Sequence, residues 1–563
     1  MNALNLSSDY KVSIKSYPFE KEIIEQLRDG TNDLWPIVYF IESDSIKEAY
    51  IGESTSVYKR MTNHFTNPER ANLSNVHIMY SKSFNKSAIL DIESRLIKYI
   101  GADGIYELQN ANGGLIEHNY YQQENYENLF KKIWIKLYRK KLVKNSISKI
   151  YNSDLFKFSP YKTLTNDQFD SVLKILWKIE NKTKSPIIIT GGAGTGKTVL
   201  ATYIIKLFKN KLNEDEENLD KDFQNILDSI ENININFSKI EIGFVIPQQS
   251  LRETIKNVFK YVKGLSPNMV LSARDVIKKE YDIIFVDEAH RLRRRKNLPG
   301  GYAYTAFDNI SKKLGLDPSK CDELDWIIKR SKQQIIFYDP LQSIKPTDIK
   351  PEKISKLINK KSKIELKSQL RVLGGNDYIE YIDDILSVKN PKKVVDWGNY
   401  ELKLYKEFAP FLKQIKSMNK KHDLCRMIGG YSWKWVSKKD PSKFDIEIDG
   451  IKLRWNVEEV DWINSDNSID EVGCIHTTQG YDLNFGGIIF GREIDYNPRT
   501  NQIEIDRKLY FDQTGRNGIE DDLLKEYIIN IYKTIMYRGI KGTYVYAYNK
   551  NFRNYLSKFM MVK

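Results

Sequence analysis

The segment GGAGTGKT, residues 191–198, limits what this chain can fold into more than any other part of its sequence. It has the G-x-x-x-x-G-K-[ST] spacing, it directly follows the apolar run PIIIT, and the residues after it, VLATYIIKLF, read as a helix. The glycines let backbone N–H groups converge on a phosphate at the N-terminus of that helix. The segment therefore predicts a strand, a phosphate-binding loop and a helix, which together form a building unit of a parallel sheet.

This loop indicates a site for a nucleoside triphosphate. Lys197 is expected to reach the β- and γ-phosphates, and Thr198 is expected to bind a magnesium ion. The expected nucleotide-binding residues are Gly191, Gly192, Ala193, Gly194, Thr195, Gly196, Lys197 and Thr198.

A second apolar run ends in an acidic pair. YDIIFVDEAHR (281–291) places Asp287 and Glu288 directly after a predicted strand. Asp287 is the expected magnesium ligand, and Glu288 is the expected base that activates the attacking water. An acidic pair after a strand is only moderately specific by itself, and its position downstream of a phosphate loop strengthens the prediction.

Strands alternate with helices from residue 164 onward, which predicts an α/β fold with parallel sheets. Because the strands fall into two successive series, we expect two lobes, with ligands beyond the carboxyl ends of the strands. The first series is 186–190, 242–246, 282–287 and 334–339, and the second is 426–431, 472–477, 486–491 and 542–548.

Six segments in a fixed order resemble the motifs of superfamily 1 helicases. They are LTNDQ (164–168), IGFVIPQQSLRETI (242–255), FYDPLQ (337–342), LKSQLR (366–371), GCIHTTQGYD (473–482) and YKTIMYRGIKGTYVY (532–546). More narrowly, DEAHR, HTTQGYD and RGIKGTYVY resemble the Schlafen-type helicase branch, although Tyr537 stands where a threonine is usual.

The resemblance implies two RecA-like lobes that enclose ATP. It implies that Gln168 reads adenine and that Gln342 senses the γ-phosphate. It also implies that Arg371 and Arg538 of the second lobe stabilise charge on the transferred phosphoryl group.

The N-terminal part carries two short apolar runs, IVY (37–39) and YIG (50–52), which read as a hairpin. Downstream, Arg60 and His64 lie one helical turn apart and share a helix face. Residues 86–100 have helical spacing of their apolar positions and carry Glu93. Over residues 35–115 the pattern resembles the GIY-YIG nuclease family, with Ile37 where the first motif has glycine.

This second resemblance implies a small mixed α/β domain with a metal-dependent phosphodiesterase site. Tyr39 and Tyr50 would handle water or protons, and His64 is a further expected catalytic residue. Arg60 would neutralise the attacked phosphate, and Glu93 would hold Mg²⁺ or Mn²⁺. The late asparagine of the family is expected at Asn110, with Asn112 as its rival.

A basic helical stretch, FKKIWIKLYRKKLVKNSISK (130–149), separates the two resemblances. It contains eight Lys or Arg residues from 131 onward and no acid. It reads either as a solvated linker helix or as a surface that follows phosphates. The expected domains are a nuclease domain (1–125), a basic helical connector (126–163), a first ATPase lobe (164–347) and a second lobe (348–563).

The amino-acid composition limits which binding partners and which cellular compartment we expect for this protein. The 88 Lys and Arg residues outnumber the 74 Asp and Glu residues, and the net charge of +14 favours a polyanionic partner. The three cysteines form no CxxC pair, which argues against disulfides and cysteine zinc sites. No apolar run approaches the ~18 residues of a membrane span, and the N-terminus is too polar for a signal peptide. We therefore expect a cytoplasmic protein without a membrane partner.

Together the two resemblances favour an ATP-dependent helicase or translocase fused to a divalent-metal-dependent endonuclease. DNA is the expected partner, with RNA possible as an alternative, and the architecture implies bacterial defence against phage DNA. Two other functions stay open. One is an ATP-switched nucleic-acid sensor with an inactive nuclease module, and the other is a DNA repair helicase-nuclease.

Overall fold

The computed structural model describes residues 11–29, 34–110, 123–158, 160, 164–183, 185–209, 239–262, 264–340, 342, 345–358, 363–389, 391, 394–440, 442–458, 462–465, 467–478 and 481–563. The chain forms two compact units. Unit 1 comprises residues 1–181, 198–239 and 255–268, and unit 2 comprises residues 182–197, 240–254 and 269–563. Among the helices that the structure describes, none has both the length and the apolar character needed to cross a membrane.

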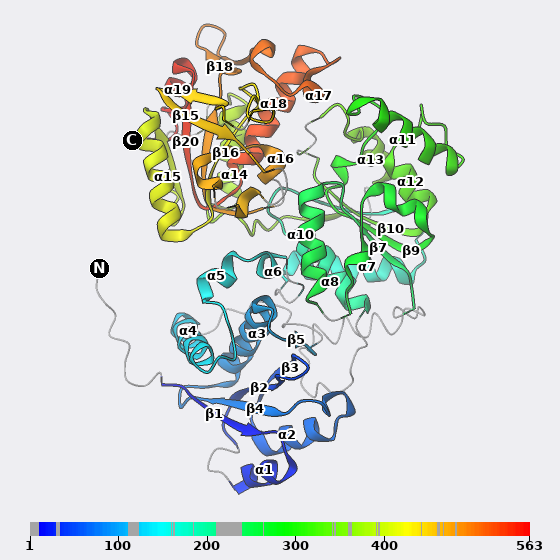
Figure 1. Ribbon diagram of the computed structural model, residues 1–563, viewed down its shortest axis with the longest axis vertical. Coiled ribbons are helices and arrows are strands. Elements are labelled where there is room, and N and C mark those ends of the chain that lie inside the picture. Colours follow the sequence, from blue (N-terminus) through cyan, green and yellow to red (C-terminus); the bar gives the residue numbers. More distant parts are fainter. Residues whose placement is uncertain are drawn as a thin grey trace. The chain divides into compact units, whose positions relative to one another are not determined.

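The N-terminal part of unit 1 is built on a five-stranded sheet with the order β1-β4-β2-β3-β5 (Figure 1). The predicted hairpin is confirmed, because β2 and β3 pair antiparallel with Tyr39 opposite Gly52. The strands are β1 Ser13–Pro18, β2 Ile37–Ser43, β3 Glu48–Ser54, β4 Asn75–Tyr80 and β5 Glu107–Leu108.

Three α-helices accompany this sheet, and the predicted helix over residues 86–100 is confirmed. Its observed bounds, Lys86–Asp103, follow from local chemistry. Asn85 caps its N-terminus by accepting from the backbone N–H of Ala88, and Gly104 ends it in the left-handed conformation at φ 68°. The helices are α1 Lys21–Gln26, α2 Val57–Thr66 and α3 Lys86–Asp103.

Residues 130–139 of the basic stretch form the C-terminal part of α4 (Gln123–Arg139), which packs against α3. The rest of the stretch lies beyond the end of this helix. Tyr99 of α3 contacts the rings of Phe130 and Trp134 edge-on, at centroid distances of 5.0 and 5.7 Å. The apolar face of α4 is therefore its buried face, which turns its lysines outward. The remaining helices of unit 1 include α5 Ile147–Asn152, α6 Asp154–Lys157, α7 Asn166–Glu180 and most of α8 Lys197–Lys209.

Unit 2 contains a six-stranded sheet with the order β11-β6-β10-β9-β7-β8, and every neighbouring pair is parallel. All four strands predicted for the first series are present. The sheet also takes in β11, which lies beyond residue 347, the expected end of the first lobe. The strands are β6 Ile187–Gly191, β7 Ile242–Val245, β8 Val270–Leu271, β9 Tyr281–Val286, β10 Ser331–Tyr338 and β11 Ile364–Leu366.

A second sheet of unit 2 has eight strands in the order β14-β15-β16-β13-β17-β20-β12-β21. Its central strands are parallel, and β18 and β19 form a separate hairpin. The strands are β12 Glu401–Tyr405, β13 Cys425–Gly429, β14 Ile446–Ile448, β15 Ile451–Trp455, β16 Glu471–Gly473, β17 Leu483–Phe490, β18 Ile494–Asn497, β19 Gln502–Ile505, β20 Gly539–Ala547 and β21 Met561–Val562.

One predicted strand of the second series, 472–477, is wrong in its second half. Strand β16 ends at Gly473, and a short helix, α16, spans Ile475–Thr478. The backbone N–H of Thr478 donates to the carbonyl oxygen of Cys474 at 3.2 Å, which closes a helical turn in place of an extended backbone. The hydroxyls of Thr477 and Thr478 also donate to this oxygen, at 3.1 and 2.8 Å.

Helices connect the strands of unit 2. They are α10 Gln249–Lys260, which continues into unit 1, α11 Gly300–Lys313, α12 Glu323–Lys329, α13 Pro351–Leu357, α14 Gly375–Leu386, α15 Phe408–His422, α17 Gln513–Arg516, α18 Asp521–Met536 and α19 Lys550–Leu556. Separate apolar clusters form around the two sheets.

Candidate nucleotide site and candidate nuclease site

The phosphate-binding loop joins β6 to α8, as the sequence predicts. Gly194 and Gly196 adopt positive φ angles of 81° and 75°, a backbone conformation that residues with a β-carbon rarely adopt. A β-carbon on Gly194 would also lie 2.0 Å from Oε1 of Gln369. The loop thus depends on glycine for both its turn and its close packing.

The segment after β11 supports this loop. The side-chain amide of Gln369 donates to the carbonyl oxygen of Ala193 at 2.6 Å, and the backbone N–H of Leu370 donates to the carbonyl oxygen of Gly194 at 2.9 Å. Two consecutive peptide units of the loop are therefore held by one short segment. This arrangement was not foreseen from the sequence, where Gln369 and Leu370 are simply part of LKSQLR.

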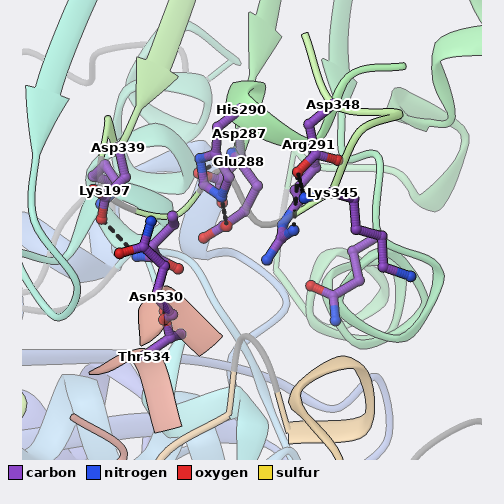
Figure 2. Close-up of polar contacts among 12 residues, drawn as sticks. Lys197, Asp287, Glu288, His290, Arg291, Asp339, Lys345, Asp348, Asn530 and Thr534 are labelled. Atoms are coloured by element: carbon purple, nitrogen blue, oxygen red, sulfur yellow. Dashed lines mark hydrogen bonds and ion pairs between the residues drawn. The ribbon is translucent and has the colours of Figure 1, made fainter. Parts of the chain in front are cut away.

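Lys197 lies within the loop and is 6% exposed. Its ammonium donates to the carbonyl oxygens of Gly191 and Gly192 at 2.7 and 2.8 Å, and Nζ lies 3.5 Å from Oδ2 of Asp339 (Figure 2). The ammonium of Lys197 therefore already lies inside the loop, where a bound phosphate would contact it. The residues of the loop therefore fit a nucleotide.

The acidic pair lies directly after β9. Oδ1 of Asp287 accepts from the backbone N–H of Glu288 at 2.9 Å, and Glu288 adopts a left-handed backbone with φ 49°. Nε2 of His290 lies 2.9 Å from Oε2 of Glu288 (Figure 2). A non-glycine residue in this conformation at a strand end is typical of functional sites.

Glu288 is ionised in this environment. Burial alone would raise the pKa of its carboxyl, but His290, Lys197 and Arg291 together hold that pKa well below its usual range. The carboxylate can therefore accept a proton at neutral pH, as a base that activates water must.

Gln342 and Asp339 extend the site from the end of β10. The amide of Gln342 donates to Oδ2 of Asp339 at 2.5 Å, and the same oxygen is the one close to Lys197. Oε1 of Gln342 is buried and has no hydrogen-bond partner among the described residues. Asp339 thus links the phosphate loop to the expected γ-phosphate sensor. Sequence reasoning missed it, although it is the acidic residue of the segment FYDPLQ.

Arg538 and Arg371 belong to the same charged neighbourhood. Arg538 is 2% exposed, donates to the carbonyl oxygen of Tyr481 at 3.3 Å, and has a buried Nε with no partner in the part of the chain that the structure describes. Burial and the charge of Arg371 lower the pKa of Arg538 to about 9, against the opposing charges of Glu288 and Asp482. Arg371 is itself paired with Asp482. A buried arginine with an unused donor fits a site that receives an anion.

Gln168 has a structural role that the sequence did not predict. Its side-chain oxygen accepts from the backbone N–H of Thr165 at 3.1 Å, and Thr165 caps α7 in return. Adenine recognition by Gln168 stays a prediction. Thr198 follows Lys197 in the first turn of α8, and no group of three His, Cys, Asp or Glu residues forms a metal cluster among the described residues.

In unit 1 the structure brings four predicted nuclease residues together. The hydroxyl of Tyr39 lies 2.6 Å from Nε2 of His64, and Nε of Arg60 donates to the same hydroxyl at 3.0 Å. Nη2 of Arg60 lies 3.5 Å from the hydroxyl of Tyr50, and the two tyrosine rings stack at 6.3 Å. Hairpin β2-β3 supplies the tyrosines, and one face of α2 supplies Arg60 and His64.

The charges of this cluster are shaped by its burial. Burial and neighbouring Tyr50 raise the pKa of Tyr39 well above its usual value of 10, and Arg60 acts in the opposite direction. Burial, Arg70 and Arg60 hold the pKa of His64 far below its usual value, so its imidazole is neutral. Glu93 of α3 acts electrostatically on Tyr39 and on Arg60, which puts it in the same neighbourhood.

Asn110 holds the backbone of β3. Its side-chain oxygen accepts from the N–H of Ile51 at 2.9 Å, and its amide donates to the carbonyl oxygen of Ile51 at 2.7 Å. Ile51 is the central residue of YIG, so Asn110 fixes the strand that carries Tyr50. Its rival, Asn112, lies outside the described residues.

Arg70 joins the cluster without any signal in the sequence. It ends a short 3-10 helix, Pro68–Arg70, and is 5% exposed. Its guanidinium contacts Nδ1 of His64 and stacks over the ring of Tyr50 at 4.0 Å. The residue follows the last motif position on α2 by six residues, in a loop whose composition carries no pattern.

The outward face of α4 forms a shallow basic groove with the start of β1. The groove has a volume of about 360 Å³ and is lined by Lys11, Val12, Lys132, Ile135, Lys136 and Arg139. The groove lining holds four basic residues and no acid, as a surface that binds a phosphate backbone requires.

Comparison with known proteins finds a similar yeast protein and similar solved structures. The uncharacterized protein YPL245W of Saccharomyces cerevisiae is 26% identical over 420 residues, which cover 68% of this chain and 85% of that protein. Two solved helicase structures share 12% and 13% identity, both with a TM-score of 0.26. They are Pif1 helicase from Candida albicans, covering 70% of this chain and 97% of that one, and Pif1 helicase from Bacteroides in complex with ADP-AlF3 and ssDNA, covering 68% and 93%.

At these TM-scores the solved structures carry no argument, and the assignment rests on the family match. Residues 184–549, well over half of the chain, match the Schlafen group 3 DNA/RNA helicase domain. The matched region contains the phosphate loop, the acidic pair, Gln342 and both arginines. The chain therefore belongs to the Schlafen group 3 DNA/RNA helicase domain family.

Proposed function

We propose that this chain is an ATP-driven nucleic-acid helicase or translocase joined to a divalent-metal-dependent endonuclease. One observation carries the motor half. Lys197, Asp339 and Gln342 form a connected polar chain at the phosphate loop, within the region that matches the helicase family. The ionised Glu288 and the buried Arg538 interact electrostatically with each other beside it.

Each of these residues has a separate role in the proposed hydrolysis of ATP. Lys197 holds the β- and γ-phosphates, and Glu288 accepts the proton of the attacking water. Arg538 and Arg371 stabilise the charge that develops on the transferred phosphoryl group, and Gln342 reports whether the γ-phosphate is present. Asp287 and Thr198 would hold Mg²⁺, which supplies further positive charge to the phosphates when bound.

The nuclease half rests on the cluster of Tyr39, Tyr50, Arg60 and His64. In phosphodiester hydrolysis a water oxygen bonds to phosphorus, the bond to one bridging oxygen breaks, and the water gives up a proton. Tyr39 or Tyr50, in its phenolate form, takes that proton, and the leaving oxygen takes a proton from solvent. Arg60 stabilises the pentacoordinate phosphorus. Glu93 would hold Mg²⁺ or Mn²⁺, which polarises the phosphodiester when bound.

We infer that the nucleic acid is DNA and that the combined activities serve defence against phage DNA. The basic groove on α4 and the net charge of +14 support a polyanionic substrate. A second candidate is an ATP-switched nucleic-acid sensor whose nuclease module is inactive. Two features favour this candidate. The raised pKa of Tyr39 makes it a poorer proton acceptor, and the buried side chain of Ile37 stands where the GIY-YIG nuclease family has glycine.

The experiment that tests the proposal measures cleavage of single- and double-stranded DNA with Mg²⁺ or Mn²⁺, with and without ATP. Wild type is compared with Glu93→Ala and Lys197→Ala. Asp91→Ala is the matched control, because Asp91 lies on the same helix as Glu93 and pairs with Arg95 at 2.9 Å. We expect metal-dependent cleavage that Glu93→Ala abolishes and Asp91→Ala retains.

The ATPase of the same proteins separates the two candidates. Glu93→Ala is expected to hydrolyse ATP at the wild-type rate, whereas Lys197→Ala is expected to lose hydrolysis. Wild-type protein with DNA-stimulated ATPase but no cleavage under any metal would overturn the nuclease half and favour the sensor. Normal turnover by a folded Lys197→Ala protein would overturn the motor half.

A further inference from the structure

Arg70 is a buried arginine that neither the motif pattern nor the proposed chemistry uses. Its guanidinium lies between two members of the nuclease cluster, at Nδ1 of His64 and 4.0 Å from the ring of Tyr50. Burying a cation costs free energy unless it is paired or hydrogen-bonded, so the contacts that Arg70 makes in this position call for an explanation.

The donor inventory of these side chains determines where the proton of His64 lies. A guanidinium has only N–H donors, so Nδ1 of His64 has to accept from Arg70. A neutral imidazole carries a single N–H, and burial together with Arg70 and Arg60 keeps His64 neutral by holding its pKa far below the usual range. The ring proton of His64 therefore lies on Nε2.

The consequence appears at Tyr39. Nε2 of His64 lies 2.6 Å from the hydroxyl oxygen of Tyr39, and as an N–H it donates to that oxygen. Nε of Arg60 donates to the same oxygen at 3.0 Å. The oxygen of Tyr39 thus accepts two hydrogen bonds, and such bonds favour the phenolate form. They act against burial and Tyr50, which raise the pKa of Tyr39 well above its usual value. Nη2 of Arg60 also lies 3.5 Å from the hydroxyl of Tyr50.

We propose that Arg70 is a positioning residue that fixes His64 in its Nε2–H tautomer, so that His64 donates a hydrogen bond to the hydroxyl oxygen of Tyr39. The tautomer itself follows from the contacts of Arg70, whereas its role in cleavage rests on the proposed nuclease function.

The tautomer can be read without any cleavage. Full-length protein with ¹³C,¹⁵N-labelled histidine contains six histidines, and a His64→Gln variant identifies the signal of His64. We expect wild type to show the Nε2–H tautomer in its ring ¹⁵N shifts. Arg70→Met, which keeps the length but removes the donors, is expected to shift His64 towards the Nδ1–H form. Arg70→Lys keeps a donor and is expected to restore Nε2–H.

Arg28→Met is the matched control, because Arg28 also stacks on a tyrosine of this domain, at 5.5 Å from Tyr58. It should leave the His64 signal unchanged. An Nδ1–H tautomer in wild type, or an unchanged His64 signal in folded Arg70→Met, would overturn the proposal. The Arg70→Lys protein guards against a mere loss of fold, because it retains the charge.

Cleavage then tests the role of the tautomer. Arg70→Met is expected to cleave DNA about 10- to 100-fold more slowly, the range known for residues that orient a functional histidine. Its rate should rise at higher pH than that of wild type, because Tyr39 loses a donor, and Arg70→Lys should recover most of the rate. Equal rates and pH profiles in wild type and Arg70→Met would overturn the inference while leaving the nuclease intact. No cleavage by wild type would overturn the nuclease proposal and leave the tautomer standing.

Discussion

A β-carbon on Gly52 would lie 2.1 Å from the hydroxyl oxygen of Tyr39. The two residues are opposite each other in the antiparallel pair of β2 and β3, and the tyrosine side chain crosses over its glycine partner. Packing therefore explains the glycine of YIG. Only a hydrogen atom at this position leaves room for the Tyr39 hydroxyl, which contacts His64 and Arg60.

Gly52→Ala should consequently disable the nuclease without affecting the motor. The added methyl group displaces the Tyr39 hydroxyl and breaks its hydrogen bonds. We expect DNA cleavage to fall at least about 100-fold, in line with the loss of a positioned general base, while ATP hydrolysis stays at the wild-type rate. Ser54→Ala on the same strand is the control for general damage to β3. Wild-type cleavage by Gly52→Ala would show that the Tyr39 hydroxyl has no part in the reaction.

Lys197 offers the corresponding test of the motor. Its ammonium already donates to the loop carbonyl oxygens at 2.7 and 2.8 Å, so a phosphate has to replace those hydrogen bonds when it binds. Lys197→Ala should reduce ATP hydrolysis by about 1,000-fold or more, since the phosphates lose a fixed positive charge. Lys312→Ala, an exposed lysine of α11, is the control. Steady-state phosphate release with matched circular dichroism spectra measures the effect.

The pairing of Glu288 with His290 makes a prediction about pH. The pKa of Glu288 is held well below 4.5 by its neighbours, with His290 the strongest of them. Since the ionised form is the active base, wild-type ATP hydrolysis should not decline through this group between about pH 8 and pH 5. His290→Ala leaves the burial of Glu288 in place and removes the strongest opposing influence, so the pKa rises.

An acid limb should therefore appear in the ATPase profile of His290→Ala, with the rate falling as the pH drops towards about 5. The profile is measured as kcat against pH, normalised to its plateau. His422→Ala, a change at a partly exposed histidine of α15, should keep the wild-type profile. Identical acid limbs in wild type and His290→Ala would contradict the assignment of His290 as the group that keeps Glu288 ionised.

Short-range patterns foretold much of this fold. The hairpin over residues 37–54 and the parallel strands β6, β7, β9 and β10 were visible as continuous apolar runs. Helix α3 was visible from the helical spacing of its apolar residues. The features that could not be predicted depend on pairing between strands that are far apart in the sequence. Strand β11 is only three residues long, IEL, and belongs to the first sheet because it pairs with β6, which is far away in the sequence.

The same division holds for the candidate sites. Lys197, Glu288, Tyr39 and Arg60 lie in motifs whose spacing carries their chemistry, so the sequence could identify them. Arg70 is different, because its position beside His64 arises from a loop that turns back after α2. No spacing rule marks a residue that reaches a candidate site only through its place in the folded chain.

A binding experiment on the basic groove of α4 can distinguish between a solvated helix face and a phosphate-binding surface. If the groove binds a single strand, Lys136→Glu with Arg139→Glu should weaken oligonucleotide binding. The slope of log K against log salt should become shallower by about 0.7 for each phosphate that the protein no longer neutralises. Lys312→Glu with Lys313→Glu on α11 changes the net charge equally and serves as the control. Fluorescence anisotropy at several salt concentrations measures both slopes, and equal slopes would favour the solvated face.

Glu493 is a buried carboxyl whose titration should be visible in the stability of the protein. It is 1% exposed, accepts from the hydroxyl of Tyr532 at 2.7 Å, and has an Oε2 with no partner among the described residues. Burial raises its pKa to about 7 from the ordinary 4.5. The folded state therefore holds a proton that the unfolded state has already released between these two pH values.

Because the unfolded state binds fewer protons in this window, unfolding becomes easier as the pH rises from about 4.5 to 7. The shift corresponds to roughly 3 kcal/mol once the group is fully ionised. Glu493→Gln carries no charge and still accepts from Tyr532, so it should be more stable than wild type at about pH 8 and similar to it at about pH 5. Urea unfolding at both pH values measures the difference, and Glu504→Gln, at an exposed residue of hairpin β18-β19, is the control. A stability difference that does not depend on pH would contradict the assignment, because only the ionised carboxylate destabilises the folded state.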